Sequence, residues 1–208
     1  MKKQDKMKIE TKYTWKDVDS GSHFPVYEAK HFVERIRPYL IEKPINRILI
    51  HSFYHCCGGY NTTETLPEWV KRHGSMHGLE EENPLILLIG NEQLEVTLTQ
   101  PSRYFLGFNT IQLQKIIDAS KVSLRSIFKA FNVNSPTYYD ISSVYANNLI
   151  GQKIKDIKLT TEFYDEKCLP EDEYFEDISI LLENGKILKI LNEVDSATIR
   201  IESNENGG

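Results

Sequence analysis

Leu85-Ile-Leu-Leu-Ile-Gly-Asn-Glu-Gln-Leu-Glu-Val96 is the stretch that decides the fold, because it reads as two short strands joined by a tight turn. The same pattern returns 94 residues later, in Ser179-Ile-Leu-Leu-Glu-Asn-Gly-Lys-Ile-Leu-Lys-Ile190. An Asn-Gly pair between apolar runs is a strong hairpin signal, because both central residues of a type I′ turn need a positive φ. We therefore predict two antiparallel hairpins in equivalent places.

A second pair of similar segments precedes the two hairpins. Leu40–Ile50 lines up with Leu149–Leu159 at an offset of 109, and apolar residues coincide at 40/149, 41/150, 45/154, 48/157 and 50/159. A further strand-like run follows each hairpin, Arg103–Phe108 and Ala197–Ile201. Each half therefore reads as a strand, an insertion, a hairpin and a last strand. The offset falls from 109 to 94 because the first insertion is longer.

Helical periodicity is found before and between these halves. Apolar residues recur at three- and four-residue steps from Val26 to Leu40, with Pro38 expected to end that helix. A similar spacing runs from Leu113 to Phe131, where Asn109 and Gln112 would form a capping pair. The shorter run Ile141–Leu149 reads as a reduced counterpart of the first helix.

These patterns predict an α+β fold of two duplicated small antiparallel β-meander modules, each with a helix packed on one face. The first module would span residues 1–109 and carry an insertion at 51–83. A connecting helical segment would span 110–135. The second module would span 136–208, with an insertion at 162–177 and a frayed tail.

Composition limits the classes of protein that this chain can represent. Its 208 residues are 40% hydrophobic and 11% aromatic, which is typical of a folded domain. The net charge of −5 argues against a protein that coats nucleic acid. An odd number of cysteines, an N-terminus without an apolar signal region and no long apolar run lead us to expect a cytoplasmic protein without a membrane partner.

The first insertion concentrates histidine and cysteine, the residues that zinc prefers as ligands. The candidate metal ligands are His51, His55, Cys56, Cys57, His73 and His77. Their spacing matches no recognised zinc motif, and the alternative is a loop with buried histidines and cysteines. Cys56 and Cys57, beside Gly58-Gly59, are also candidate reactive thiols. We expect no cofactor, with zinc as the alternative.

The second insertion is acidic and aromatic. Residues 162–177 hold eight carboxylates against Lys167, a local charge of −7. Aromatic side chains ringed by charge of one sign suit a protein-binding surface, although a solvated loop has the same composition. The candidate partner-binding residues are Phe163, Tyr164, Asp165, Glu171, Asp172, Glu173, Tyr174 and Phe175. The expected partner is a basic protein.

A nucleic-acid alternative rests on the segment between the two modules. Lys121, Arg125 and Lys129 are spaced four apart, and Lys115 precedes them, so a helix here would be locally basic. Charge on the wet face of an amphipathic helix is ordinary, and the acidic remainder would repel phosphate.

The leading prediction is a non-enzymatic cytoplasmic protein-binding module, in one form a bacterial immunity-type protein that neutralises a basic toxin enzyme. The first alternative is a zinc- or thiol-dependent hydrolase centred on the histidines and cysteines. The second is a DNA-binding regulator that uses the basic central helix.

Overall fold

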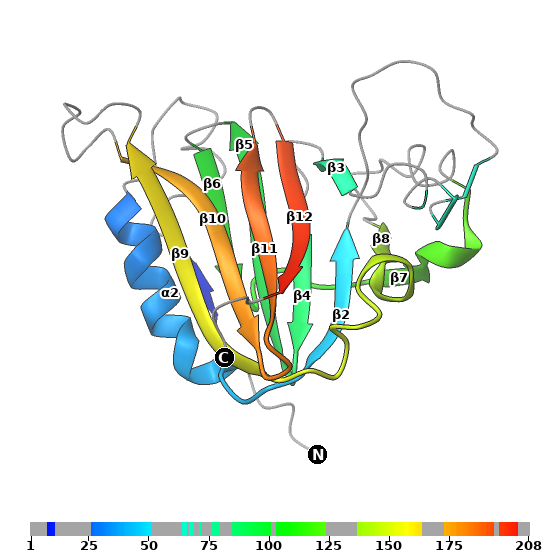
Figure 1. Cartoon of the computed structure of the whole chain (residues 1–208), viewed down its shortest axis with the longest axis horizontal. Coiled ribbons are helices and arrows are strands. Elements are labelled where there is room, and N and C mark those ends of the chain that lie inside the picture. The colour runs from blue at the N-terminus through cyan, green and yellow to red at the C-terminus, as the bar shows by residue number, and fades with distance from the viewer. Residues whose placement is uncertain are drawn as a thin grey trace.

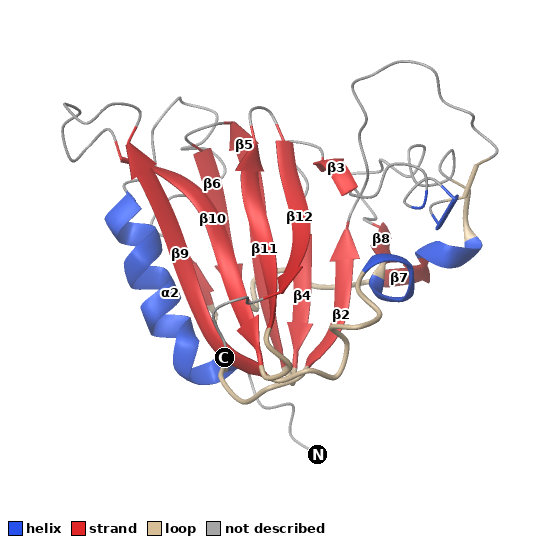
Figure 2. Ribbon diagram, in the orientation of Figure 1, coloured by secondary structure: helices blue, strands red, loops and turns tan. Residues whose placement is uncertain are grey.

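The computed structural model is rich in strands, with a long helix at one side of the described residues (Figure 2). It describes residues 8–10, 26–50, 64–65, 67–68, 71, 76–79, 85–100, 103–123, 137–163, 173–193 and 196–203. The α+β class expected from the sequence is confirmed.

Seven strands of the described chain form the first sheet, here called sheet one, in the order β1-β6-β5-β4-β2-β8-β7. Neighbouring strands run antiparallel, except that β7 is parallel to β8. The strands are β1 (Ile9–Glu10), β2 (Ile45–Ile50), β4 (Leu85–Ile89), β5 (Glu92–Gln100), β6 (Arg103–Phe108), β7 (Lys115–Asp118) and β8 (Thr137–Asp140).

The other strands of the described chain form sheet two, in the order β3-β12-β11-β10-β9, with every neighbour antiparallel. Its strands are β3 (Met76–Leu79), β9 (Ile154–Phe163), β10 (Glu173–Leu182), β11 (Lys186–Glu193) and β12 (Ser196–Ser203). Each sheet therefore contains the four-stranded meander that the repeated sequence pattern predicts: β2-β4-β5-β6 in sheet one and β9-β10-β11-β12 in sheet two.

The two sheets lie one in front of the other, and their apolar faces share one core (Figure 1). Leu87 of sheet one and Leu188 of sheet two are both fully buried in it. Helix α2 (Val26–Leu40) runs beside β9 and contributes the buried Ile36 to the same cluster. Apolar burial on this scale is the main favourable term in folding. The two halves thus build a single core.

A symmetric junction joins the two halves just before β2 and β9. The amide of Ile45 donates to the carbonyl of Gln152 at 3.0 Å, and the amide of Ile154 donates to the carbonyl of Lys43 at 3.0 Å. The two donors, Ile45 and Ile154, are 109 residues apart, and so are the two acceptors, Lys43 and Gln152. Between them, Pro44 and Lys153 form an antiparallel bridge. The offset read from the sequence is therefore the separation of two residues related by a local two-fold axis.

The turns that lead into this junction are also equivalent. The amide of Glu42 donates to the carbonyl of Ile154 at 2.8 Å, and that of Gly151 donates to the carbonyl of Ile45 at 2.8 Å. Glu42 has φ +63° and Gly151 has φ +84°, so both occupy the left-handed region. The chain follows the same path at both places, although one residue there is a glycine and the other is not.

The hairpins are confirmed, but their turns are not of type I′. Gly90 has φ +56° while Asn91 has no positive φ, which is the pattern of a type II′ turn. The second turn is longer by one residue, because β10 ends at Leu182, β11 begins at Lys186, and Gly185 has φ +77°. Core-facing residues therefore correspond at an offset of 93 in β4 and β10, and at 94 in β5 and β11.

Two predictions of helix were wrong for the described residues. Helix α2 does not end at Pro38 but runs on to Leu40. The stretch predicted as helix from Leu113 contains strand β7 and the short 3-10 helix η1 (Ala119–Lys121). Strand β7 forms because Ile116 and Ile117 pair with Tyr138 and Tyr139 of β8. Residues 124–131 of the predicted helix lie outside the described residues.

The predicted module boundaries are crossed by strands from both sides. Strand β8 lies in the predicted second module, 136–208, yet it pairs with β2 in sheet one. Strand β3 belongs to the insertion of the first half, yet it pairs with β12 of the second half, with Leu79 opposite Ala197. The reduced helix expected over Ile141–Leu149 is present as α5 (Ser142–Tyr145). No helix in the described ranges is long and apolar enough to cross a membrane.

Candidate functional site

The acidic and aromatic insertion is carried by the hairpin of β9 and β10. Each strand has ten residues, and they pair to their ends at Phe163 and Glu173 (Figure 1). Tyr174 pairs with Glu162, and Phe175 pairs with Thr161. The candidates Phe163, Glu173, Tyr174 and Phe175 thus gather at one end of sheet two, opposite the turn at Gly185. Tyr164, Asp165, Glu171 and Asp172 lie outside the described residues.

A buried carboxylate marks the base of this hairpin end. Asp177 is 3% exposed and accepts a hydrogen bond of 2.6 Å from the hydroxyl of Ser179. A register shift between Phe175 and Asp177 separates the hairpin end from the regular part of the sheet. Such β-bulges bend a strand and redirect the residues beyond it.

The candidate metal ligands are not brought together by the described structure. His77 is in β3, at the edge of sheet two, whereas His51, His55, Cys56, Cys57 and His73 lie outside the described residues. Within the part of the chain that is described, no group of three or more His, Cys, Asp or Glu residues could hold a metal ion. The zinc and thiol hypotheses therefore rest on the sequence alone.

The basic central helix of the DNA-binding hypothesis is wrong where the structure describes it. Lys115 is in strand β7, and Lys121 is in η1, where its ammonium group lies 3.1 Å from the carboxylate of Asp118. Hydrogen bonds from Ser120, together with this interaction with Lys121, lower the pKa of Asp118. Arg125 and Lys129 lie outside the described residues. The described part of the segment therefore offers no recognition helix.

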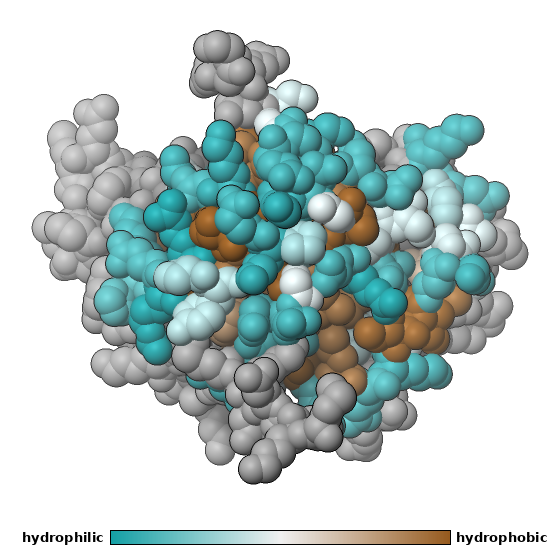
Figure 3. Space-filling view, turned by 90° about the horizontal axis from the view of Figure 1, so that it is seen from below, coloured by the Kyte–Doolittle hydropathy of each residue, from teal (hydrophilic) through white to brown (hydrophobic). Residues whose placement is uncertain are grey.

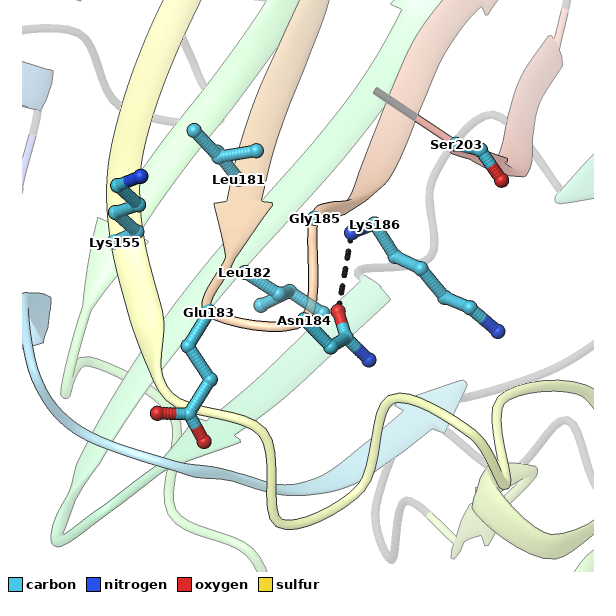
Figure 4. Close-up of a pocket in the computed structure, with 8 residues that line it drawn as sticks. All are labelled: Lys155, Leu181, Leu182, Glu183, Asn184, Gly185, Lys186 and Ser203. Atoms are coloured by element: carbon cyan, nitrogen blue, oxygen red, sulfur yellow. Dashed lines mark hydrogen bonds between the residues drawn. The ribbon is translucent and has the colours of Figure 1, made fainter. Parts of the chain in front are cut away.

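A hollow of about 470 Å³ lies at the turn between β10 and β11 (Figure 4). The side-chain carbonyl of Asn184 accepts a hydrogen bond of 3.0 Å from the amide of Lys186 and stabilises the turn. Lys155 and Lys186 both line the hollow, but their ammonium groups lie at opposite sides of it, and Glu183 adds a negative charge (Figure 4). The cations do not converge, so the hollow is not an anion site.

A second hollow, of about 350 Å³, lies between α2 and β9. Three of the charged groups that line it are paired with one another, because Asp156 lies 2.8 Å from Arg37 and 3.6 Å from Lys158. The end of the molecule that carries the turns is largely hydrophilic, with apolar patches between polar side chains (Figure 3). Scattered apolar patches of this kind are ordinary on protein surfaces.

The most highly connected polar group of the described structure was missed by the sequence analysis. Glu95 is fully buried and accepts hydrogen bonds from the amides of Thr110 (2.8 Å) and Ile111 (2.9 Å) and from the side chain of Gln93 (2.5 Å). The hydroxyl of Thr110 donates to it as well. Its neighbour across the strands is Gly107. A glycine inside a strand is a signal of close approach, and it could have revealed this cluster.

The comparisons with known proteins assign no family. No protein-family model, curated protein or solved structure matched the chain.

Proposed function

We propose that the chain is a non-enzymatic protein-binding module that recognises a basic protein through the end of the β9–β10 hairpin. This hairpin end comprises residues 162–177. The observation that carries the proposal is the pairing of Phe163 with Glu173 and of Tyr174 with Glu162. It gathers aromatic and acidic residues from two strands at one end of sheet two.

The composition of the hairpin end favours a protein as its ligand. A few residues carry most of the binding energy of a protein interface, and tyrosine is enriched among them. Charge of one sign speeds the encounter with a partner of opposite sign. A local charge of −7 would repel nucleic acid and anionic lipid. A toxin-neutralising protein that blocks a basic enzyme is one concrete form of this function.

Charge reversal at the hairpin end tests the proposal. The triple variant Glu171→Lys, Asp172→Lys and Glu173→Lys changes the net charge by +6. The matched control, Glu34→Lys, Glu42→Lys and Glu183→Lys, makes the same change at exposed sites elsewhere. The probe is a cationic globular protein such as lysozyme, with affinity measured by titration calorimetry at several salt concentrations.

We expect the hairpin variant to weaken binding at least about tenfold and to reduce its salt dependence, because charge pairs at an interface are screened by salt. The control should bind nearly as well as the unmodified protein. Tyr164→Ala, which leaves the charge unchanged, should also weaken binding. Equal losses in both triple variants would show a general charge effect and would contradict a binding site at the hairpin end.

A further inference from the structure

A short segment crosses the outer face of sheet one, on the side away from the shared core. We call Asn109–Leu113 the strap. It leaves the end of β6 at Asn109, whose φ of +60° turns the chain back over the sheet. Asparagine tolerates this left-handed conformation better than most residues. The strap's Ile111 and Leu113 pack on a separate small apolar cluster of Leu49, Ile86, Leu88 and Tyr138.

Strand β5 holds the strap through a set of hydrogen bonds. Glu95 accepts from the amides of Thr110 and Ile111. The side chain of Gln93 donates to the carbonyl of Ile111 at 2.9 Å. Asn109 exchanges hydrogen bonds of 2.9 Å with the backbone of Gln93 in both directions. Because Glu95 serves both central amides of the strap, this carboxylate is the main latch.

The equivalent face of sheet two shows why sheet one carries a strap. The core pair Leu94 and Phe108 of sheet one is equivalent to the core pair Leu188 and Ile201 of sheet two. The next pair along, Glu95 and Gly107 in sheet one, is therefore equivalent to Lys189 and Arg200 in sheet two. Lys189 forms an ion pair of 3.0 Å with Glu202 on that face. Leu49 and Ile86 correspond to Lys158 and Ser179. At these two positions the outer face of sheet two is therefore polar, whereas that of sheet one is apolar and is covered by the strap.

We propose that the strap is a conformational device, latched by Glu95, which opens as one unit and uncovers the apolar outer face of sheet one while the shared core stays folded. Local opening of this kind occurs where a segment makes few buried contacts with the rest of the protein. The strap meets this condition, because its two apolar side chains belong to a cluster distinct from the core between the sheets.

Native-state hydrogen exchange tests the proposal on the full chain. The amides of Thr110 and Ile111 report on the strap, and those of Leu87 and Leu188 report on the shared core. In the unmodified protein we expect the strap amides to exchange faster than the core amides, with a smaller dependence on denaturant. Glu95→Gln should accelerate strap exchange about tenfold or more without changing Leu188, because a charged acceptor of two amides is lost.

Asp177→Asn is the matched control, since Asp177 is the buried carboxylate on the outer face of sheet two. It should leave strap exchange unchanged. The proposal is overturned if the strap and core amides of the unmodified protein exchange at one rate with one denaturant dependence. It is also overturned if Glu95→Gln accelerates Leu188 as much as Ile111, or if Asp177→Asn releases the strap equally. If Glu95→Gln does not fold, the unmodified protein alone decides.

Discussion

Pro44 and Lys153, which are 109 residues apart, face each other in an antiparallel bridge at the centre of the junction between the two halves. The residues on either side of this bridge form the same set of backbone hydrogen bonds in both halves. Backbone hydrogen bonds depend little on side-chain identity, so this symmetry persists although proline stands at one position and lysine at the other. The equivalent geometry is what an internal duplication predicts.

The two positive-φ turns of the junction should respond to mutation in opposite directions. Glu42→Gly is expected to raise the free energy of unfolding by about 1 kcal/mol, because a non-glycine residue at φ +63° is strained. Gly151→Ala should lower it by a similar amount at φ +84°. Urea unfolding measures both. Glu183→Gly, at an exposed turn position without a positive φ, is the control and should bring no gain.

Gly107→Ala should destabilise the protein by about 2 kcal/mol, a typical cost of inserting a methyl group where no space exists. A Cβ atom at this position would collide with Oε2 of Glu95 and lie 2.8 Å from Oγ1 of Thr110. The combination with Glu95→Ala should cost less than the sum of the single changes, because the colliding carboxylate is gone. Additive free energies of unfolding would contradict this close contact.

The ionisation of Tyr138 should report the charge of Glu95. Burial raises the pKa of Tyr138 above 10.0, and the negative charge of Glu95 raises it further. Glu95→Gln should therefore lower the pKa of Tyr138 without returning it to 10.0. Burial alone raises the pKa of Tyr139, so that residue is an internal control and should not change. Ultraviolet or NMR titration of the tyrosines measures both.

The same pKa directions predict how stability depends on pH in the alkaline range. A tyrosine with a raised folded-state pKa holds its proton more tightly when folded, so its contribution to stability is complete below about pH 10. We expect the free energy of unfolding to fall as pH rises above that value. Tyr138→Phe should reduce this fall, whereas a free energy of unfolding that does not change between pH 9 and 11 would contradict the prediction.

Pro38→Ala is expected to raise the free energy of unfolding by about 1 kcal/mol. Proline inside helix α2 cannot donate a backbone hydrogen bond to the residue four positions earlier, whereas alanine can. Alanine also gives the unfolded chain more conformational entropy than proline does, which offsets part of the gain in stability. Thermal unfolding followed by circular dichroism measures the effect. A lower midpoint would show that the fixed φ of Pro38 matters more than the missing donor.

Much of the fold could be predicted from local patterns. Apolar runs on either side of Gly90-Asn91 and Asn184-Gly185 located both hairpins, because short strands and tight turns are encoded within a few residues. The strand Arg103–Phe108 was located to the residue. The turn types could not be predicted in this way. The second turn has one more residue than the first, which changes its geometry but leaves the pattern of apolar residues on either side unchanged.

Features that depend on distant partners could not be predicted. Leu113, Ile116 and Ile117 fit helical spacing, but the tyrosines of β8 offer a parallel partner, and tertiary pairing overrides so short a pattern. Strand β3 lacks an alternating pattern and exists through β12, which lies far along the chain. Glu95 reads as an ordinary strand residue until the chain that folds over it is known. At the candidate site, β9 runs on to Phe163 and β10 begins at Glu173, so both strands extend into the stretch predicted as the insertion 162–177. Neither this extension nor the pairing register of the two strands could be predicted.

The pairing of β3 with β12 gives the first insertion a protective role that does not depend on any ligand. Without residues 76–79, the main-chain donors and acceptors along one side of β12 would become an open sheet edge. Open edges are templates on which other chains add strands. Shortening the insertion would therefore be expected to promote self-association before it changed anything at the hairpin end.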